Sequence, residues 1–358
     1  MVFPPLDVGT VDIDEVAKDW DELADRLDAS PFVRPGWVRA WARAFASGPV
    51  RVVTAREHGG RLVGLLALER RLGVFRSPVN SHSPEAPLLA SRTGAAEALL
   101  GHVLAGRPAA VAVGPLDIRD ASLDEVRNAL RTSAYATVEH VVARPPFISG
   151  RGGIDDYRRT VSPNLRHDVE RRLRRLMEEG GVALAISDGS HGLSTLLEEG
   201  FLVERQSWKG ASGTAIASDP ATRGFYSDVA RWASGRGWLR LAFLRLDGRP
   251  IAFQLDLEAG RSYRSLKIGY DPSFARFSPG KVLTYSMVCR AMARGHASYE
   301  LLGTNEPWKD RWADGLRELV VAYGFVSGPR GALARSALRA RGAVKRVRTH
   351  LASPETRR

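Results

Sequence analysis

The run Arg276-Phe277-Ser278-Pro279-Gly280-Lys281 combines residue types that can bind an anion where a helix begins. Gly280 lets a ligand approach the backbone, and a helix N-terminus presents unpaired N–H groups with a partial positive charge. Arg276 and Lys281 add mobile positive charge. We therefore predict that Arg276, Ser278, Gly280 and Lys281 bind the pyrophosphate of a cofactor. An ordinary Pro-Gly helix start explains the same residues, and the sequence leaves both interpretations open.

Other kinds of catalytic chemistry find little support. The sequence contains none of the short motifs of nucleophile-elbow serine hydrolases, zinc peptidases, phosphate-binding loops or calcium loops. The single cysteine, Cys289, excludes an internal disulfide framework and a zinc site made of several cysteines. We assign no metal. Side chains at strand ends remain the positions that could supply a base, a hydrogen-bond donor to developing negative charge and accurate positioning.

The elements that position these residues form an α/β pattern. In the first half, residues 12–48 predict two helices with a break at Ser30-Pro31, and Trp37, Trp41 and Phe45 recur at the spacing of a buried helix face. Residues 50–55 and 62–69 predict two paired strands. The proline-rich residues 77–89 predict a loop that carries His82 and Glu85. The Pro-, Gly- and Arg-rich residues 144–153 are the expected linker.

The second half opens with a helix that begins at Ser162-Pro163 and ends at Gly180-Gly181. Residues 240–246 and 251–257 predict a hairpin, because apolar and polar residues alternate along the second strand. Further strands are expected at residues 262–270, 298–302 and 319–325, with a helix at 280–294. We predict domains at 1–145 and 155–328, followed by a basic tail at 330–358.

Positive charge is concentrated in that tail. The net charge is +12, and nine Lys and Arg residues stand against Glu355 alone from Arg330 onward. One helical stripe there carries Leu333, Ala337, Ala340, Val344, Val347 and Leu351. This pattern predicts a basic amphipathic helix that contacts tRNA or an anionic membrane surface, and a solubilising tail is the alternative. No signal peptide or membrane span is expected, so we predict a cytoplasmic protein, peripheral at the inner membrane face.

Several segments together resemble one known family. They are S-W-K-G at 207–210, L-R-L-D-G-R-P-I-A at 244–252, L-K-I-G-Y-D at 266–271, F-S-P-G-K-V-L at 277–283 and Y-E-L-L-G-T-N-E-P-W-K-D-R-W-A at 299–313. In order and spacing they resemble the BioF2-like branch of the GNAT acyltransferase superfamily, close to the Fem-type aminoacyl transferases. The resemblance implies two GNAT-like domains, each a mixed twisted sheet flanked by helices, with a transfer site between them or in the second.

The resemblance also implies a donor and several site residues. CoA binds in a gap between two central strands of a GNAT domain, with its pyrophosphate on the next helix N-terminus in a pattern Q/R-x-x-G-x-G/A. Here Gly280 comes one place late, which puts CoA in doubt, and Fem-type relatives take an aminoacyl group from tRNA instead. Glu300 stands where the family usually has Asp and is our first candidate base. Lys309 stands at a family lysine that binds donor phosphate or stabilises the oxyanion.

Further candidates follow from position along the chain. Gln254, on the polar face of the hairpin strand, and Lys267 are expected to bind the cofactor. Tyr270 and Asp271, at a strand end, are expected to supply a proton donor and an orienting carboxylate. The list of expected substrate-binding residues is Trp208, Lys209, His82 and Glu85. For Glu300, Lys309, Asp271 and His82 the alternatives are a structural carboxylate, a surface lysine, an ordinary turn starter and a solvent-exposed loop residue.

Three functions fit these observations. The first is an acyltransferase that moves an acetyl or similar group from acyl-CoA to an amine or hydroxyl of a sugar, a cell-envelope precursor or a small biosynthetic metabolite. The second is an aminoacyl-tRNA-dependent, amide-forming transferase of the Fem type. The third is a GNAT-like protein that binds a ligand without catalysis. The sequence does not identify the acceptor, because loop side chains from two domains would form its pocket.

Overall fold

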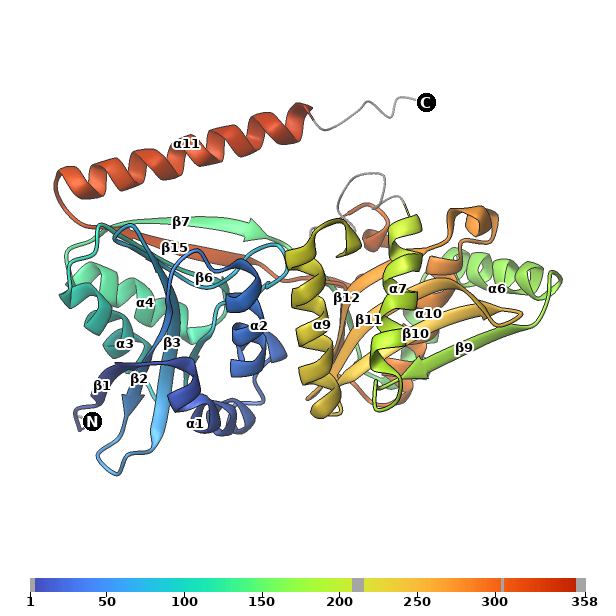
Figure 1. Ribbon diagram of the computed structural model, residues 1–358, viewed down its shortest axis with the longest axis horizontal. Coiled ribbons are helices and arrows are strands. Elements are labelled where there is room, and N and C mark those ends of the chain that lie inside the picture. The colour runs from blue at the N-terminus through green and yellow to red at the C-terminus, as the bar shows by residue number, and fades with distance from the viewer. Residues whose placement is uncertain (1–3, 208–215, 304–305, 352–358) are drawn as a thin grey trace.

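The computed structural model describes residues 4–207, 216–303 and 306–351. It contains two mixed sheets, each flanked by helices, and a long helix beside them (Figure 1). The strands of the first sheet are β1 (Asp7–Val11), β2 (Val50–Arg56), β3 (Leu62–Arg71), β4 (Val74–Arg76), β5 (Leu88–Ala90), β6 (Ala110–Asp117), β7 (Ala136–Ala143) and β15 (Leu319–Phe325). They are ordered β1-β2-β3-β4-β6-β15-β7, with β5 paired to β3.

The second sheet is ordered β14-β8-β13-β12-β11-β10-β9. Its strands are β8 (Pro146–Ser149), β9 (Val182–Ser187), β10 (Leu239–Leu246), β11 (Arg249–Ala259), β12 (Ser262–Tyr270), β13 (Ser298–Glu300) and β14 (Gly315–Leu316). In this sheet all pairs are antiparallel except β12 with β13. In the first sheet all pairs are antiparallel except β4 with β6. The expected hairpin is confirmed, because β10 pairs with β11 from Leu239↔Leu257 to Leu246↔Arg249.

Helices cover both sheets. The α-helices are α1 (Ile13–Arg26), α2 (Pro35–Phe45), α3 (Ala95–Ala105), α4 (Ala121–Thr132), α5 (Gly153–Thr160), α6 (Pro163–Met177), α7 (Leu193–Gln206), α9 (Pro220–Gly235), α10 (Pro279–Ala293) and α11 (Pro329–Leu351). Short 3-10 helices are η1 (Pro31–Val33), η2 (Ile216–Ser218), η3 (Pro272–Phe277) and η4 (Lys309–Arg311). In the part of the chain that the structure describes, no helix is long and apolar enough to cross a membrane.

Two strands, β8 and β15, do not lie in the sheets that the predicted domain boundaries imply. The strand expected to close the second domain, β15, lies in the first sheet, where Ala322 pairs with Val113 of β6 and Glu139 of β7. The expected linker contains β8, which pairs with β13 and β14 of the second sheet. The chain therefore crosses between the sheets twice, and a division at residues 145 and 155 does not separate them. Strand pairing is non-local, so a linear pattern does not specify it.

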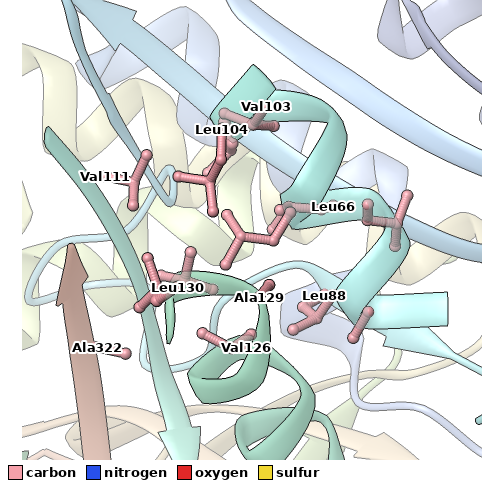
Figure 2. Packing of buried hydrophobic residues seen from close by; sticks show 14 of the residues in the cluster. Leu66, Leu88, Val103, Leu104, Val111, Val126, Ala129, Leu130 and Ala322 are labelled. Carbon is pink, nitrogen blue, oxygen red and sulfur yellow. The ribbon is translucent and has the colours of Figure 1, made fainter. Parts of the chain in front are cut away.

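The first hydrophobic core confirms the place of β15. Figure 2 shows Ala322 of β15 beside Val126, Ala129 and Leu130 of α4, among the packed side chains of α3 and β6. At Gly324 an added Cβ would lie 2.3 Å from Cδ2 of Leu130. A glycine at this position of β15 lets α4 pack directly on the sheet.

A further core joins the two sheets. Phe32, Trp37 and Trp41 of the first half pack with Phe225 of α9 and Phe253 of β11, and all five are almost fully buried. The aromatic stripe expected at Trp37 and Trp41 is therefore a core face, as predicted. Its partners belong to the second domain, so the two domains share one hydrophobic core.

Candidate active site

The parallel pair of β12 and β13 forms the frame of the site. Three residue pairs make this ladder, from Ser262↔Ser298 to Arg264↔Glu300, and β12 then continues to Tyr270. Side chains alternate across a strand, so Arg264 and Glu300 share one face while Tyr263 and Tyr299 share the other. The two tyrosine rings stack with their centres 5.1 Å apart, in the core beneath α10. The opposite face, with Arg264 and Glu300, borders the first domain.

A cavity of about 310 Å³ lies between the domains on that face. Glu85 and Asp117 line it from the first domain, and Arg264, Glu300 and Arg317 line it from the second. Leucine, proline and alanine side chains form much of the remaining wall. Such a chamber, mostly apolar with a few convergent charged groups, is the usual form of a small-molecule site.

Glu300 is held in one orientation. Arg317 donates to Glu300 Oε1 at 2.5 Å and to Oε2 at 3.2 Å, and Ser298 Oγ donates to Oε1 at 2.7 Å. The hydrogen bond that Arg317 donates to Glu300 raises the pKa of the Arg317 guanidinium. Both carboxylate oxygens of Glu300 are therefore already engaged by donors, which fixes the side chain against Arg317 and Ser298. The arrangement thus favours a positioning role for Glu300 over the expected role as base.

The carboxyl group of Glu85 has a raised pKa. Burial raises the pKa of its carboxyl, and the nearby charge of Glu300 raises it further. The positive charge of Arg264 and a hydrogen bond from Ser30 oppose this shift without cancelling it. A carboxylate whose pKa moves towards neutrality is a suitable general base. The sequence assigned Glu85 to substrate binding, and its place in the cavity also suits proton transfer.

The residues of the predicted anion site come together at the start of α10. Ser278 has a φ of 47° and Pro279 occupies the first turn, as expected for a helix start. The two cations, however, already have partners. Lys281 Nζ donates to Asp168 of α6 at 2.7 Å, and Arg276 donates to Glu179 at 2.9 Å. Hydrogen bonds, first of all from Lys281, hold the pKa of Asp168 well below its usual range.

Tyr270 and Asp271 complete this corner of the molecule. A Cβ added at Gly280 would lie 3.3 Å from the Tyr270 ring, so the tyrosine covers the position where a ligand was expected to approach. Asp271 accepts from Ser273 N at 2.9 Å and from Arg249 at 2.5 Å. Burial alone would raise the pKa of Asp271, but these hydrogen bonds lower it. Asp271 therefore caps η3, which is the turn-starting alternative.

Gln254 lies inside the sheet rather than on an open face. Its Nε2 donates at 2.9 Å to Asp256 Oδ1 and at 2.9 Å to Ser265 Oγ, and it also bonds Tyr299. The side chain is fully buried. The polar face predicted for this strand thus packs beneath α10 as a hydrogen-bonded network, and Gln254 meets neighbouring side chains where a donor amide was expected.

Lys267 and His82 meet on Tyr226 of α9, apart from the α10 corner. Lys267 Nζ lies 5.0 Å from the centre of the Tyr226 ring, and His82 Nδ1 lies 3.1 Å from its hydroxyl oxygen. His82 also stacks on Phe45. Burial, helped by the charge of Lys267, lowers the pKa of His82 to about 4, so the imidazole is neutral at physiological pH. His82 is therefore an interdomain residue and not a solvent-exposed one.

Lys309 is buried rather than a surface lysine. Its Nζ donates to the carbonyl oxygen of Leu302 at 2.8 Å and lies 4.0 Å from Glu306. Leu302 and Gly303 both have positive φ values, so Lys309 fixes a sharp bend just after β13.

Trp208 and Lys209, which were expected to bind the substrate, lie outside the described residues. Arg317 and Arg264 could not be predicted as site residues, since neither belongs to a recognised motif and only the fold brings them to the cavity.

Comparison with known proteins agrees with this architecture. FemX has a TM-score of 0.59 at 11% identity, over 92% of this chain and 99% of that one. The structure of L-PGS from Bacillus licheniformis has a TM-score of 0.52 at 11% identity, over 80% and 90%. A C-terminal domain assigned to lysylphosphatidylglycerol synthetase from Agrobacterium fabrum has a TM-score of 0.57 at 11% identity, over 90% and 95%. At these identities the likeness shows a shared fold.

The paired mixed sheets, with a short parallel ladder beside the start of a helix, form the two-domain fold that this chain shares with FemX. Residues 163–310 match the model of the acetyltransferase (GNAT) domain family, and this match supports an acyltransferase. A search of curated proteins found no match.

Proposed function

We propose that the protein transfers an acyl group from acyl-CoA to an amine bound in the cavity between the domains. The observation that carries this proposal is the pair of unlike carboxyl groups there, Glu85 with a raised pKa and Glu300 held by Arg317. Around them the cavity presents more carboxyl than guanidinium groups, because Asp117 and Asp120 also line it. Such a lining attracts an ammonium group and can then accept its proton.

The proposed reaction divides the work among these residues. Glu85 accepts a proton from the ammonium, and the free amine attacks the acyl carbonyl carbon. A C–N bond forms while the C–S bond of the thioester breaks, and the proton that the attacking nitrogen then loses passes to the sulfur, so CoA leaves as the thiol. Glu300 and Arg317 orient the acceptor, and Arg264 keeps Glu85 close to its working pKa by opposing the effect of burial. The acceptor classes in view are an amino sugar, a cell-envelope precursor and a small biosynthetic amine.

A second candidate is transfer from aminoacyl-tRNA, in which the same attack breaks a C–O ester bond. The start of α10 favours it, because Asp168 and Glu179 already neutralise the two cations expected to hold a pyrophosphate. A donor bound elsewhere on the protein would not need this corner. The charged tail between Arg330 and Arg348 offers another place for a polyanion.

Donor binding separates the two candidates. We expect acetyl-CoA and CoA to bind with micromolar affinity in calorimetry, and Arg276→Glu to weaken this binding by about tenfold, because the guanidinium is mostly exposed and close to the helix start. Arg231→Glu, an equally large charge change on exposed α9, is the control. Absence of CoA binding at low and physiological salt, with activity on charged tRNA, would establish the second candidate instead.

Glu85→Gln tests the proposed base. With amine acceptors and acetyl-CoA, we expect kcat to fall about 100-fold while the affinity for the donor is unchanged. The acidic limb of the pH–rate profile, which reports ionisation of Glu85, should also disappear. Glu178→Gln, at an exposed position just after the end of α6 and absent from the cavity lining, should leave both quantities unchanged. An intact acidic limb in Glu85→Gln would remove Glu85 from the mechanism.

A further inference from the structure

The helix α11 is attached to the first sheet at its start. It contacts β15 and β6, and an added Cβ at Gly331 would meet the carbonyl oxygen of Val326, so the start of the helix is packed on the first domain. Beyond this start, Figure 1 shows α11 running past the outer strand β7 with a visible separation from the body. Most of the stability of a helix in a protein comes from packing of its amphipathic face, so a surface that α11 contacts would stabilise it.

The two sides of α11 differ in exposure. Gly331 is buried, and Ala334, Arg335 and Leu338 on the same side are partly covered. Leu333, Ala337 and Ala340 are exposed, and the Leu333 side chain has 75% of its surface accessible. At 100° per residue these three positions fall within an arc of about 60°. The stripe from Leu333 to Ala340 therefore faces away from the protein. In the sequence, Val344, Val347 and Leu351 continue the same spacing.

Basic residues accompany this stripe. The helix carries Arg330, Arg335, Arg339, Arg341, Lys345, Arg346 and Arg348, and it has no acidic residue. By the same helical geometry, positions 330, 341 and 348 lie directly beside the apolar stripe. A narrow apolar face flanked by cations, and no anions, is typical of a helix that lies in the headgroup region of an anionic bilayer.

We propose that α11 docks the enzyme on an anionic lipid surface, with the stripe from Leu333 to Leu351 in the interface and the flanking cations on lipid phosphates. Nucleic acid would also attract the cations, but its backbone offers nothing for the exposed Leu333 side chain to bury against. The exposed stripe therefore favours lipid. Docking through α11 would hold the first domain close to the membrane without any segment crossing it.

Two alanines on α11 provide a matched test. Ala337 lies on the stripe and Ala332 lies about 100° away from it, and both are exposed. Ala337→Asp and Ala332→Asp change the charge equally, so a difference between them reports burial of the stripe. The full-length variants are titrated with vesicles of phosphatidylcholine that contain roughly one-third phosphatidylglycerol, and with vesicles of phosphatidylcholine alone.

We expect wild type and Ala332→Asp to bind the anionic vesicles within about twofold of each other, and Ala337→Asp to bind at least tenfold more weakly. Pure phosphatidylcholine should bind all three proteins poorly. Equal binding by the two variants would overturn the proposal. So would preferential binding of the wild type to total tRNA with no difference between the variants, which would assign α11 to nucleic acid. Unchanged melting temperatures exclude a loss of fold as the cause.

Discussion

Asp256 is a carboxylic acid enclosed within the second sheet. Its Oδ1 accepts from Gln254, while Oδ2 is buried and has no hydrogen-bond partner. Burial raises the pKa of Asp256 to about 8, against the opposing effect of the hydrogen bond from Gln254. Below that pH the group is neutral in the folded protein, where it needs no counter-ion. A buried acid of this kind links stability to pH.

The sign of this linkage gives a prediction. The unfolded chain ionises Asp256 near pH 4, whereas the folded chain does so near pH 8, so its contribution to stability is complete below pH 4 and is lost as the pH rises to about 8. The slope approaches about 1.4 kcal/mol per pH unit. Asp256→Asn should remove this part of the pH dependence in urea unfolding between pH 5 and 9. Asp155→Asn, exposed on α5, should not, and parallel curves for Asp256→Asn and wild type would contradict the assignment.

At the scale of elements, β15 is the penultimate strand of a sheet whose other strands come from the first half of the chain. It pairs on one side with β6 and on the other with β7. Without β15, those two strands would expose two unpaired edges, and Ala322 and Val320 would leave the first core. A sheet that loses a strand paired on both sides loses ladder hydrogen bonds and core packing together. The first domain therefore depends on the end of the second.

Two truncations test this dependence. A chain of residues 1–328 lacks α11 but keeps β15, and we expect it to melt within about 2 °C of the full chain. A chain of residues 1–318 lacks β15 as well, and we expect it to lose the cooperative unfolding of the first domain. Amide exchange in β6 and β7 is the decisive measurement. Protection of those strands in the 1–318 chain would show that the first domain folds without β15.

The limits of sequence-based prediction are clear from the same elements. Alternation along residues 251–257 predicted a strand of the hairpin, and helical spacing predicted α2, because both are local periodicities. β15 is apolar throughout, a pattern that fits a buried strand of either sheet, so its partner could not be predicted. In the site, Glu300, Lys309 and the α10 corner were found by position in family-like segments. Arg317 lies 17 residues from Glu300, and only the fold brings these two side chains together.

At the scale of the whole molecule, the interface between the domains is a hydrophobic core. Trp37 of α2 meets Phe225 of α9 edge to face at 5.2 Å, and its Nε1 donates to Ser83 Oγ at 2.8 Å. Since Ser83 lies between His82 and Glu85 in the chain, this hydrogen bond also holds the loop that lines the cavity. A close-packed core is destabilised by added atoms as well as by removed ones. A methyl group added in this interface should therefore alter the cavity as well as the stability of the protein.

Gly36 and Gly224 are matched positions for an added methyl group. Gly36 of α2 packs so closely on α9 that an added Cβ would lie 2.1 Å from Nε1 of Trp232, whereas a Cβ at Gly224 would meet nothing within 4 Å. We expect Gly36→Ala to lower the free energy of unfolding by about 1–3 kcal/mol through overpacking. Gly224→Ala should raise it by about 0.5–1 kcal/mol, because alanine is the better helix former. Urea unfolding measures both.

The cause of the Gly36→Ala effect can be separated from a local change in helix propensity. If the new methyl group acts by displacing Trp232, its cost should shrink in a Trp232→Ala background, where the space is free. The added methyl group should also lower acyl transfer more than Gly224→Ala does, since it moves α2 and the attached loop with Glu85 away from Arg264 and Glu300. If Gly36→Ala lost stability equally in both backgrounds and kept full activity, the shared core would hold the domains together without setting the geometry of the cavity.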